Sequence, residues 1–259
     1  MKIALTQPSI KFEDKEANRS ICLFSLCAAA EHGATLALLP EMTLTGFTMN
    51  TDGMGETAEA PETIDYFVRA AKLLKLSIGF GYIEKTADRA LNKYMVVDQE
   101  GRILSDYAKL HPFSYAGENE YFRGGTKIST FKLEDFKIST TICYDLRFPE
   151  LYQACSKECG LISVAANWPK SRHEHWLALL KARAIENQCY IAAVNIMGNS
   201  NGIEYGGGSM LLDPYGNSLA YPIVGTDVLL GEAVMDTVTK YREAFPLKND
   251  RREDLYSKL

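Results

Sequence analysis

The stretch "KISTTICYDLRFPELYQACSKECGLISVAANWP" (137–169) predicts a strand, a helix and a second strand in immediate succession. Strand-forming residues run up to Ile142, and a helical segment follows that starts at a proline and stops at Gly160. "LISVAANWP" is then an apolar strand. Short strands and amphipathic helical segments alternate in the same way along the rest of the chain, which predicts an α/β or α+β sandwich whose sheets are covered by helices.

The same patterns place the other elements. Further strands are expected at 2–7, 34–40, 77–84, 93–99, 102–110, 189–198 and 227–235, and helices at 18–33, 61–76 and 173–188. We expect one hairpin with its turn at Glu134 and Asp135, and another over 208–222 around Asp213–Gly216. "YGGGS" (205–209) indicates a turn or close backbone packing. With no internal repeat or linker, 1–259 are expected to form one domain, with a tail or inter-subunit arm from about residue 240.

Composition is that of an ordinary globular protein, since 46% of the 259 residues are hydrophobic and 24% are charged. The net charge of −5 and the lack of a dense basic cluster argue against nucleic-acid binding. The six cysteines are scattered rather than spaced as a disulfide framework. No apolar run is long enough to span a bilayer, and the N-terminus does not resemble a signal peptide, so we expect a cytoplasmic protein with reduced thiols.

Three polar residues follow predicted strands: Glu41 after "LALLP", Lys109 after "RILSDYA" and Cys143 after "KISTTI". Sites in α/β sheets form at the carboxyl ends of strands, so the three side chains are placed to meet in a pocket. A neutral thiol needs a base to accept its proton, which Glu41 offers, and Lys109 is suited to stabilise an oxyanion. The alternative interpretation is a core thiol and two solvated loop residues.

Five segments together carry a family resemblance: "LLPEMTLTGF", "YAKLHPFSYAGENEYFRGG", "ICYDLRFPEL", "ANWP" and "LLKARAIENQCYIAAVN". They resemble, in order and over nearly the whole chain, the nitrilase superfamily of carbon–nitrogen hydrolases. Within it, the sequence is most similar to the bacterial omega-amidase branch, whose members remove ammonia from the side-chain amide of 2-oxoglutaramate or 2-oxosuccinamate. The resemblance implies a four-layer α-β-β-α sandwich, a homodimer or higher homo-oligomer, and catalysis without metal or organic cofactor.

The resemblance also implies roles for particular residues. Glu41 matches the general base, Lys109 the oxyanion-stabilising lysine and Cys143 the nucleophile that forms a thioester. The second glutamate of the family matches Glu118, although Glu120, two residues further on, is the alternative.

Several residues near the expected nucleophile are candidates for binding the amide substrate. The backbone N–H of Tyr144 is a candidate oxyanion donor. Arg147 is suited to a substrate carboxylate, with a structural ion pair to Asp145, Glu150 or another acidic residue as the alternative. The aromatic residues Phe113 and Trp168 are candidates for the apolar wall, or for core packing. Arg172 and Lys170 are weaker candidate cations.

Two patterns superficially suggest metal sites, but packing or a solvated helix end is the favoured interpretation of each. His173 and His175 point apart on a helix, and Cys155 and Cys159 have no further ligands to complete a tetrahedron.

The residues Glu41, Lys109 and Cys143 alone do not determine the substrate. An N-carbamoyl amino acid, an aliphatic amide or a nitrile are alternatives to an omega-amide, and a non-catalytic binding protein is a more distant one.

Overall fold

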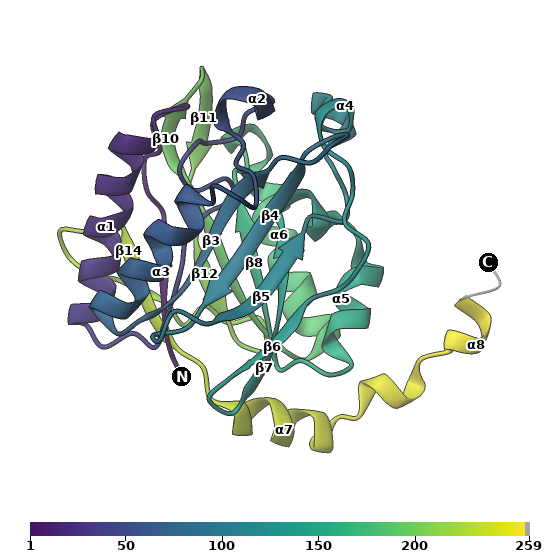
Figure 1. Ribbon diagram of the computed structural model, residues 1–259. Helices are drawn as coiled ribbons and strands as arrows, with labels where there is room; N and C mark the ends of the chain where they lie inside the picture. The colour runs from purple at the N-terminus through teal and green to yellow at the C-terminus, as the bar shows by residue number, and fades with distance from the viewer. Residues whose placement is uncertain (257–259) are drawn as a thin grey trace.

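The computed structural model describes residues 1–256 and contains two large sheets stacked between helices (Figure 1). The larger sheet has the strand order β13 (Tyr221–Pro222), β14 (Val228–Glu232), β1 (Lys2–Thr6), β2 (Leu36–Leu38), β3 (Ser77–Glu84), β4 (Leu91–Val97), β5 (Ile103–Ala108). The smaller sheet has the order β12 (Met210–Leu212), β9 (Tyr190–Asn195), β8 (Leu161–Ala166), β7 (Phe136–Ile142), β6 (Thr130–Leu133). The central strands of each sheet are parallel, β1 to β3 in one and β7 to β9 in the other, and so their carboxyl ends lie at one edge.

Helices cover the outer face of each sheet. The helices α1 (Lys15–Glu31) and α3 (Glu62–Leu74) pack on the larger sheet, while α5 (Pro149–Ser156) and α6 (His173–Asn187) pack on the smaller one. The N-terminus of α1 is capped by the Asp14 side chain, which accepts a hydrogen bond from the Ala17 backbone N–H at 3.0 Å. The shorter helical segments are α2 (Thr51–Met54), η1 (Ser114–Ala116), α4 (Glu118–Tyr121), η2 (Cys143–Arg147) and η3 (Lys170–Arg172).

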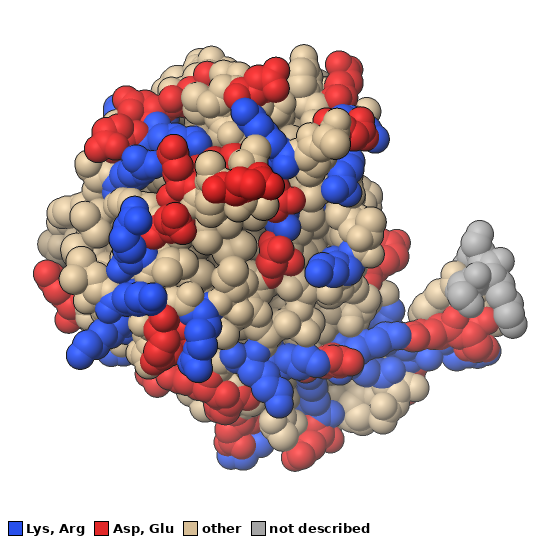
Figure 2. Space-filling model, in the orientation of Figure 1, with Lys and Arg blue, Asp and Glu red and all other residues tan. Residues whose placement is uncertain are grey.

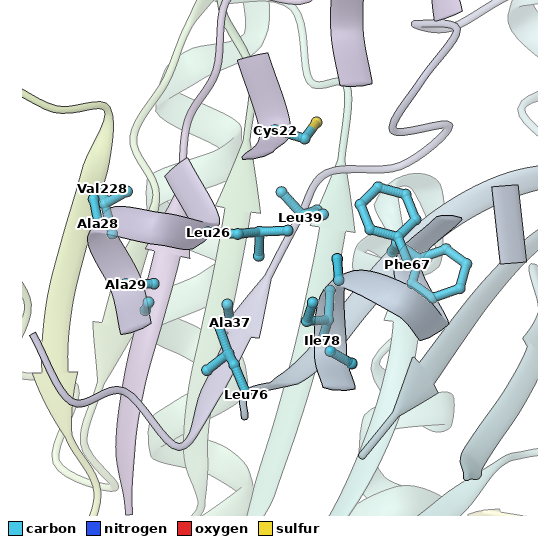
Figure 3. Close-up of a cluster of buried hydrophobic side chains, with 14 of the residues drawn as sticks. Cys22, Leu26, Ala28, Ala29, Ala37, Leu39, Phe67, Leu76, Ile78 and Val228 are labelled. Carbon is cyan, nitrogen blue, oxygen red and sulfur yellow. The ribbon is translucent and has the colours of Figure 1, made fainter. Parts of the chain in front are cut away.

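Three apolar clusters correspond to the three interfaces between layers. Figure 3 shows the cluster between the larger sheet and its helices, where Leu26 of α1 lies near Leu39, just after β2, and Ile78 of β3. Phe67 of α3 is part of the same cluster. A second cluster fills the space between the sheets, and a third lies under α5 and α6. Burying one leucine side chain of this kind stabilises the fold by about 1.5–3 kcal/mol. The predicted four-layer α-β-β-α sandwich is confirmed.

One local prediction is confirmed and another was wrong. The segment 208–222 turns at Asp213–Gly216, and its arms pair antiparallel next to the turn, where Leu212 bridges Ser218 and the Leu219 N–H donates to the Leu211 carbonyl at 2.8 Å. Further from the turn the arms separate: β12 pairs with β9, and the chain then crosses the edge of the sandwich so that β13 pairs with β14. The prediction that was wrong concerns a separate two-stranded sheet, β10 (Met197–Ser200) with β11 (Ile203–Gly206), where we expected one strand and a glycine-rich turn. Its tight turn uses Asn201 and Gly202, both with positive φ.

The C-terminal segment first packs on the sandwich and then extends from it. In α7 (Met235–Ala244) the Val238 side chain is buried in the cluster between the sheets, whereas η4 (Leu247–Asp250) and α8 (Glu253–Tyr256) extend from the body of the molecule in Figure 1. An ion pair of 2.8 Å joins Lys157 to Glu253. The expected tail or arm from about residue 240 therefore begins inside α7, and its last residues, 257–259, lie outside the described part of the chain.

The surface mixes charges of both signs. Figure 2 shows Lys and Arg interspersed with Asp and Glu over the face it presents. Among residues 1–256, no helix combines the length and the apolar composition that a bilayer-spanning segment requires.

Candidate active site

The three residues expected at strand ends converge in the structure. Glu41 follows β2, Lys109 follows β5 and Cys143 follows β7, so both sheets contribute. They come together because each strand ends at the same rim of the sandwich. The predicted grouping of these side chains is thus seen in the geometry.

Lys109 lies between two carboxylates in the interior. Its Nζ donates to Glu41 Oε1 at 2.9 Å and to Glu118 Oε2 at 2.8 Å, and all three residues are at most 1% exposed. Burial by itself lowers the pKa of Lys109, but Glu118 and Glu41 outweigh it and raise that pKa above its usual value. The lysine is therefore a fixed cation at neutral pH. Glu120, the alternative to Glu118, is exposed.

Two asparagines that the sequence analysis did not single out hold Glu41 in place. Asn92 in β4 donates from Nδ2 to Glu41 Oε1 at 2.8 Å and to Glu118 Oε1 at 2.9 Å. Asn167, just after β8, donates its backbone N–H to Glu41 Oε2 at 3.0 Å and its Nδ2 to the Glu41 carbonyl at 2.7 Å. Both carboxylate oxygens of Glu41 thus have fixed donors, which sets the orientation of the side chain.

Cys143 occupies a strained backbone position at the start of η2. Its φ of 46° lies in the left-handed region that a residue with a side chain seldom adopts. This sharp turn directs the thiol out of β7 toward Asn167, with 4.0 Å between Sγ and the Asn167 carbonyl oxygen. Asn167 therefore contacts both the thiol and Glu41.

The thiol is in its neutral form at rest. Burial raises the pKa of Cys143 well above its usual value, Glu41 adds to the increase, and Lys109 opposes it. Attack by this sulfur consequently requires a proton acceptor at the moment of reaction.

A buried aspartate links the cysteine turn to the lysine loop. Asp145 Oδ2 accepts from Tyr107 Oη at 2.7 Å and from the Ile142 N–H at 3.0 Å. Its Oδ1 accepts from the backbone N–H of His111 at 3.0 Å and lies 2.8 Å from His111 Nδ1. Because His111 is two residues from Lys109, this carboxylate fixes the two strand ends relative to each other.

Cys143 opens into a cavity of about 220 Å³. The four predicted substrate-binding residues, Phe113, Tyr144, Arg147 and Trp168, all line it, as do Phe47, Arg172 and Tyr205. No Asp or Glu among the described residues lines this cavity. Lys170, the weakest candidate cation, instead forms an exposed ion pair with Glu204 at 2.9 Å.

Two guanidinium groups face the cavity without a carboxylate partner in the described part of the chain. Arg147 lies over the Trp168 ring, with 4.8 Å from its Cζ to the ring centroid, and its Nη2 is 3.3 Å from His175 Nδ1. Arg172 lies over the rings of Phe113 and Tyr115, at 5.5 and 5.3 Å. Among residues 1–256, Arg147 forms no ion pair with Asp145, Glu150 or any other acidic residue, and Asp145 is bonded to other groups.

Within residues 1–256, no cluster of three or more His, Cys, Asp or Glu side chains is arranged to hold a metal ion. The histidine and cysteine pairs of the sequence analysis form no such group there, and Cys155 and Cys159 are free and buried.

Comparison with known proteins agrees with this geometry. Residues 2–243 match the family model "Carbon-nitrogen hydrolase". A 2-oxoglutaramate amidase of Bacillus subtilis is 34% identical over 227 residues, which are 86% of this chain and 87% of that protein. The omega-amidase YafV of Yersinia enterocolitica is 34% identical over 254 residues, 96% of each chain.

Among solved structures, a CN-hydrolase superfamily protein of Xanthomonas campestris with an arsenic adduct in its active site superposes with a TM-score of 0.89. It is 26% identical, and the alignment covers 98% of this chain and 97% of that one. Sequence, fold and site therefore agree that the chain belongs to the carbon–nitrogen hydrolase family.

Proposed function

We propose that this protein is an omega-amidase, which hydrolyses the side-chain amide of 2-oxoglutaramate or 2-oxosuccinamate to the 2-oxo dicarboxylic acid and ammonia. The single observation that carries the proposal is the cavity where Cys143 and Lys109, the latter bonded to Glu41 and Glu118 behind the cavity wall, meet two arginines that have no carboxylate partner among residues 1–256. It pairs the chemistry of amide cleavage with a site for an anionic substrate.

In the first half of the proposed reaction, Cys143 attacks the amide carbon. The Sγ–C bond forms while the thiol proton passes to Glu41, because the thiol is neutral at rest. The amide oxygen becomes an oxyanion that the Lys109 ammonium and the backbone N–H of Tyr144 stabilise. Glu41 then gives the proton to the amide nitrogen, the C–N bond breaks, and ammonia leaves.

The second half hydrolyses the thioester that remains on Cys143. Glu41 takes a proton from water as the oxygen attacks the thioester carbon, and that proton returns to the sulfur when the C–S bond breaks. One carboxylate thus alternates between base and acid. Glu118 has a positioning role in this scheme, since it bonds both the Lys109 ammonium and the Phe113 backbone N–H, the latter at 2.5 Å.

The arginines supply the substrate selectivity in this proposal. Arg147 and Arg172 bind the carboxylate at the far end of the substrate, where guanidinium groups suit a planar anion. The same pair of cations disfavours an α-ammonium group, which carries a like charge and finds no acidic residue lining the cavity. A 2-oxo acid amide therefore fits better than glutamine or asparagine. The names of the two relatives at 34% identity support this substrate class.

Domain organisation, oligomeric state and cellular location are also part of the proposed function. We propose that residues 1–259 form one domain and that the segment from about residue 240 is an arm between subunits of a homodimer or higher homo-oligomer. The six cysteines are all free, which supports the cytoplasm as the location.

A screen of ammonia release tests the function. The panel contains 2-oxoglutaramate, glutamine, an N-carbamoyl amino acid and a simple aliphatic amide, each with wild-type enzyme and with Cys143→Ala. We expect the highest kcat/KM on 2-oxoglutaramate and no turnover by the variant. A preference for the N-carbamoyl amino acid or for the uncharged amide would contradict the proposed substrate, and activity of Cys143→Ala would contradict the proposed nucleophile.

A further inference from the structure

Tyr205 is a cavity residue that the proposed mechanism does not use. It lies in β11, within the two-stranded sheet that belongs to neither large sheet. Its ring is 5% exposed, packs in the apolar cluster that contains Ile10 and Ile196, and lines the cavity that holds Cys143. A backbone bridge to Pro169 ties Tyr205 to the chain just beyond Asn167. The ring is therefore held rigidly beside the reacting groups.

Its hydroxyl differs from those of the other buried tyrosines. Five tyrosines besides Tyr205 are buried, and each hydroxyl has a hydrogen-bond partner within the protein: these are Tyr82, Tyr94, Tyr107, Tyr152 and Tyr190. The structure gives the Tyr205 hydroxyl no partner among residues 1–256. The hydroxyl oxygen is not one of the sealed polar atoms that lack a partner, and so it is accessible although the residue as a whole is 5% exposed. An accessible hydroxyl with no protein partner, on a residue that lines the reaction cavity, is available to bond a molecule bound there.

The polar atoms of the proposed substrate indicate which of them would accept a hydrogen bond from the Tyr205 hydroxyl. In the proposed mechanism the amide oxygen faces Lys109 and a backbone N–H, the amide nitrogen faces Glu41, and the carboxylate faces the arginines. One polar atom of a 2-oxo acid amide remains, the 2-oxo oxygen, which is a hydrogen-bond acceptor. Burial, together with the nearby Cys143 and Glu41, raises the pKa of the Tyr205 hydroxyl, so it keeps its proton and donates at neutral pH.

We propose that Tyr205 is a specificity-determining residue whose hydroxyl donates a hydrogen bond to the 2-oxo oxygen of the substrate. This inference rests on the proposed function and adds to it. The arginines recognise the charge of the substrate, and Tyr205 distinguishes a 2-oxo acid amide from the same chain with a methylene at that carbon.

Steady-state kinetics with two matched substrates test the proposal. Glutaramate has the chain length, amide and carboxylate of 2-oxoglutaramate and lacks only the 2-oxo oxygen. We expect Tyr205→Phe to lower kcat/KM on 2-oxoglutaramate about fivefold and to leave kcat/KM on glutaramate unchanged. The control is Tyr221→Phe, the same chemical change on a side chain that is 57% exposed and does not line the cavity, and it should alter neither value.

Thermal unfolding of the free enzyme gives a second readout. Because the Tyr205 hydroxyl has no hydrogen-bond partner among residues 1–256, Tyr205→Phe should retain the wild-type melting temperature. A clear fall in melting temperature, an equal loss on both substrates, or no loss on 2-oxoglutaramate would overturn the assignment. If the wild-type enzyme hydrolyses neither amide, the proposed function fails and this inference falls with it, whereas normal wild-type activity without the substrate-dependent loss refutes Tyr205 alone.

Discussion

Replacing Lys109 with methionine removes the one cation between two buried carboxylates. Its Nζ lies 2.9 Å from Glu41 Oε1 and 2.8 Å from Glu118 Oε2, and neither carboxylate is more than 1% exposed. Removing one member of a buried ion pair typically costs about 3–5 kcal/mol, because the remaining charge has neither partner nor water. For a domain of this size each kcal/mol shifts the melting temperature by about 2–4 °C. We therefore expect Lys109→Met to melt roughly 6–20 °C below the wild type.

A second substitution checks the cause of that loss. Adding Glu118→Gln to Lys109→Met removes one of the two like charges, so the double variant should recover part of the stability, with a coupling of about 1–3 kcal/mol. The assay is differential scanning calorimetry at neutral pH. Lys157→Met is the control, since its ion pair with Glu253 is exposed on both sides and should contribute little.

The activity of the same variant follows from the proposed oxyanion role. Loss of one oxyanion donor lowers kcat by about 10²–10³-fold. The reasoning is refuted if Lys109→Met melts like the wild type, or if adding Glu118→Gln destabilises it further by the full effect of the single change.

Three other results are expected. Arg147→Met should abolish the preference for 2-oxoglutaramate over a simple aliphatic amide while turnover of the uncharged amide persists, and unchanged selectivity in the ammonia assay would exclude a carboxylate role. Asn92→Ala should lower kcat about tenfold with little change in KM, because Nδ2 orients Glu41 and Glu118 rather than the substrate, and an unaltered kcat would remove this positioning role. Since the pKa of Cys143 is raised above that of an unfolded thiol, the stability it contributes is present below about pH 8.5 and declines as pH rises further. Alkylation by iodoacetamide should likewise accelerate only above about pH 8.5, and a midpoint near pH 7 or below would indicate a preformed thiolate instead.

The strand-end residues were predictable because their signal is local. A carboxylate, an ammonium or a thiol directly after an apolar strand points to the rim of a sheet, and Glu41, Lys109 and Cys143 all lie there. Residue order along the chain does not say that β2 and β8 end side by side. The contact between Glu41 and Asn167 depends on how two sheets stack, and this is why Asn167 was missed.

Asn92 and Tyr205 are two further residues that the sequence patterns did not single out. Asn92 lies inside the buried strand β4, where a single polar residue gives no periodic signal. Tyr205 belongs to a hairpin whose sequence, "MGNSNGIEYG", has few apolar residues, and so it looked like a loop. The Asn-Gly pair at 201–202 was the available sign of the hairpin.

Asp145 is a residue for which sequence spacing suggested the wrong partner. Its nearness to Arg147 in sequence suggested an ion pair, but its carboxylate is bonded to Ile142 at the end of β7 and to Tyr107 and His111 in and just after β5. Those bonds leave Arg147 free to face the cavity, which sequence spacing alone could not decide.

The central claim is that the acyl group of the substrate is transferred to Cys143, and mass spectrometry of the peptides from acid-quenched enzyme tests it most directly. The wild-type enzyme is mixed with 2-oxoglutaramate, quenched in acid during turnover, and digested. The account predicts an increase in mass equal to the substrate minus ammonia, confined to the peptide that contains Cys143 and absent from Cys143→Ala. Turnover by the wild type with the same adduct on another residue, or sustained turnover by Cys143→Ala, would contradict it.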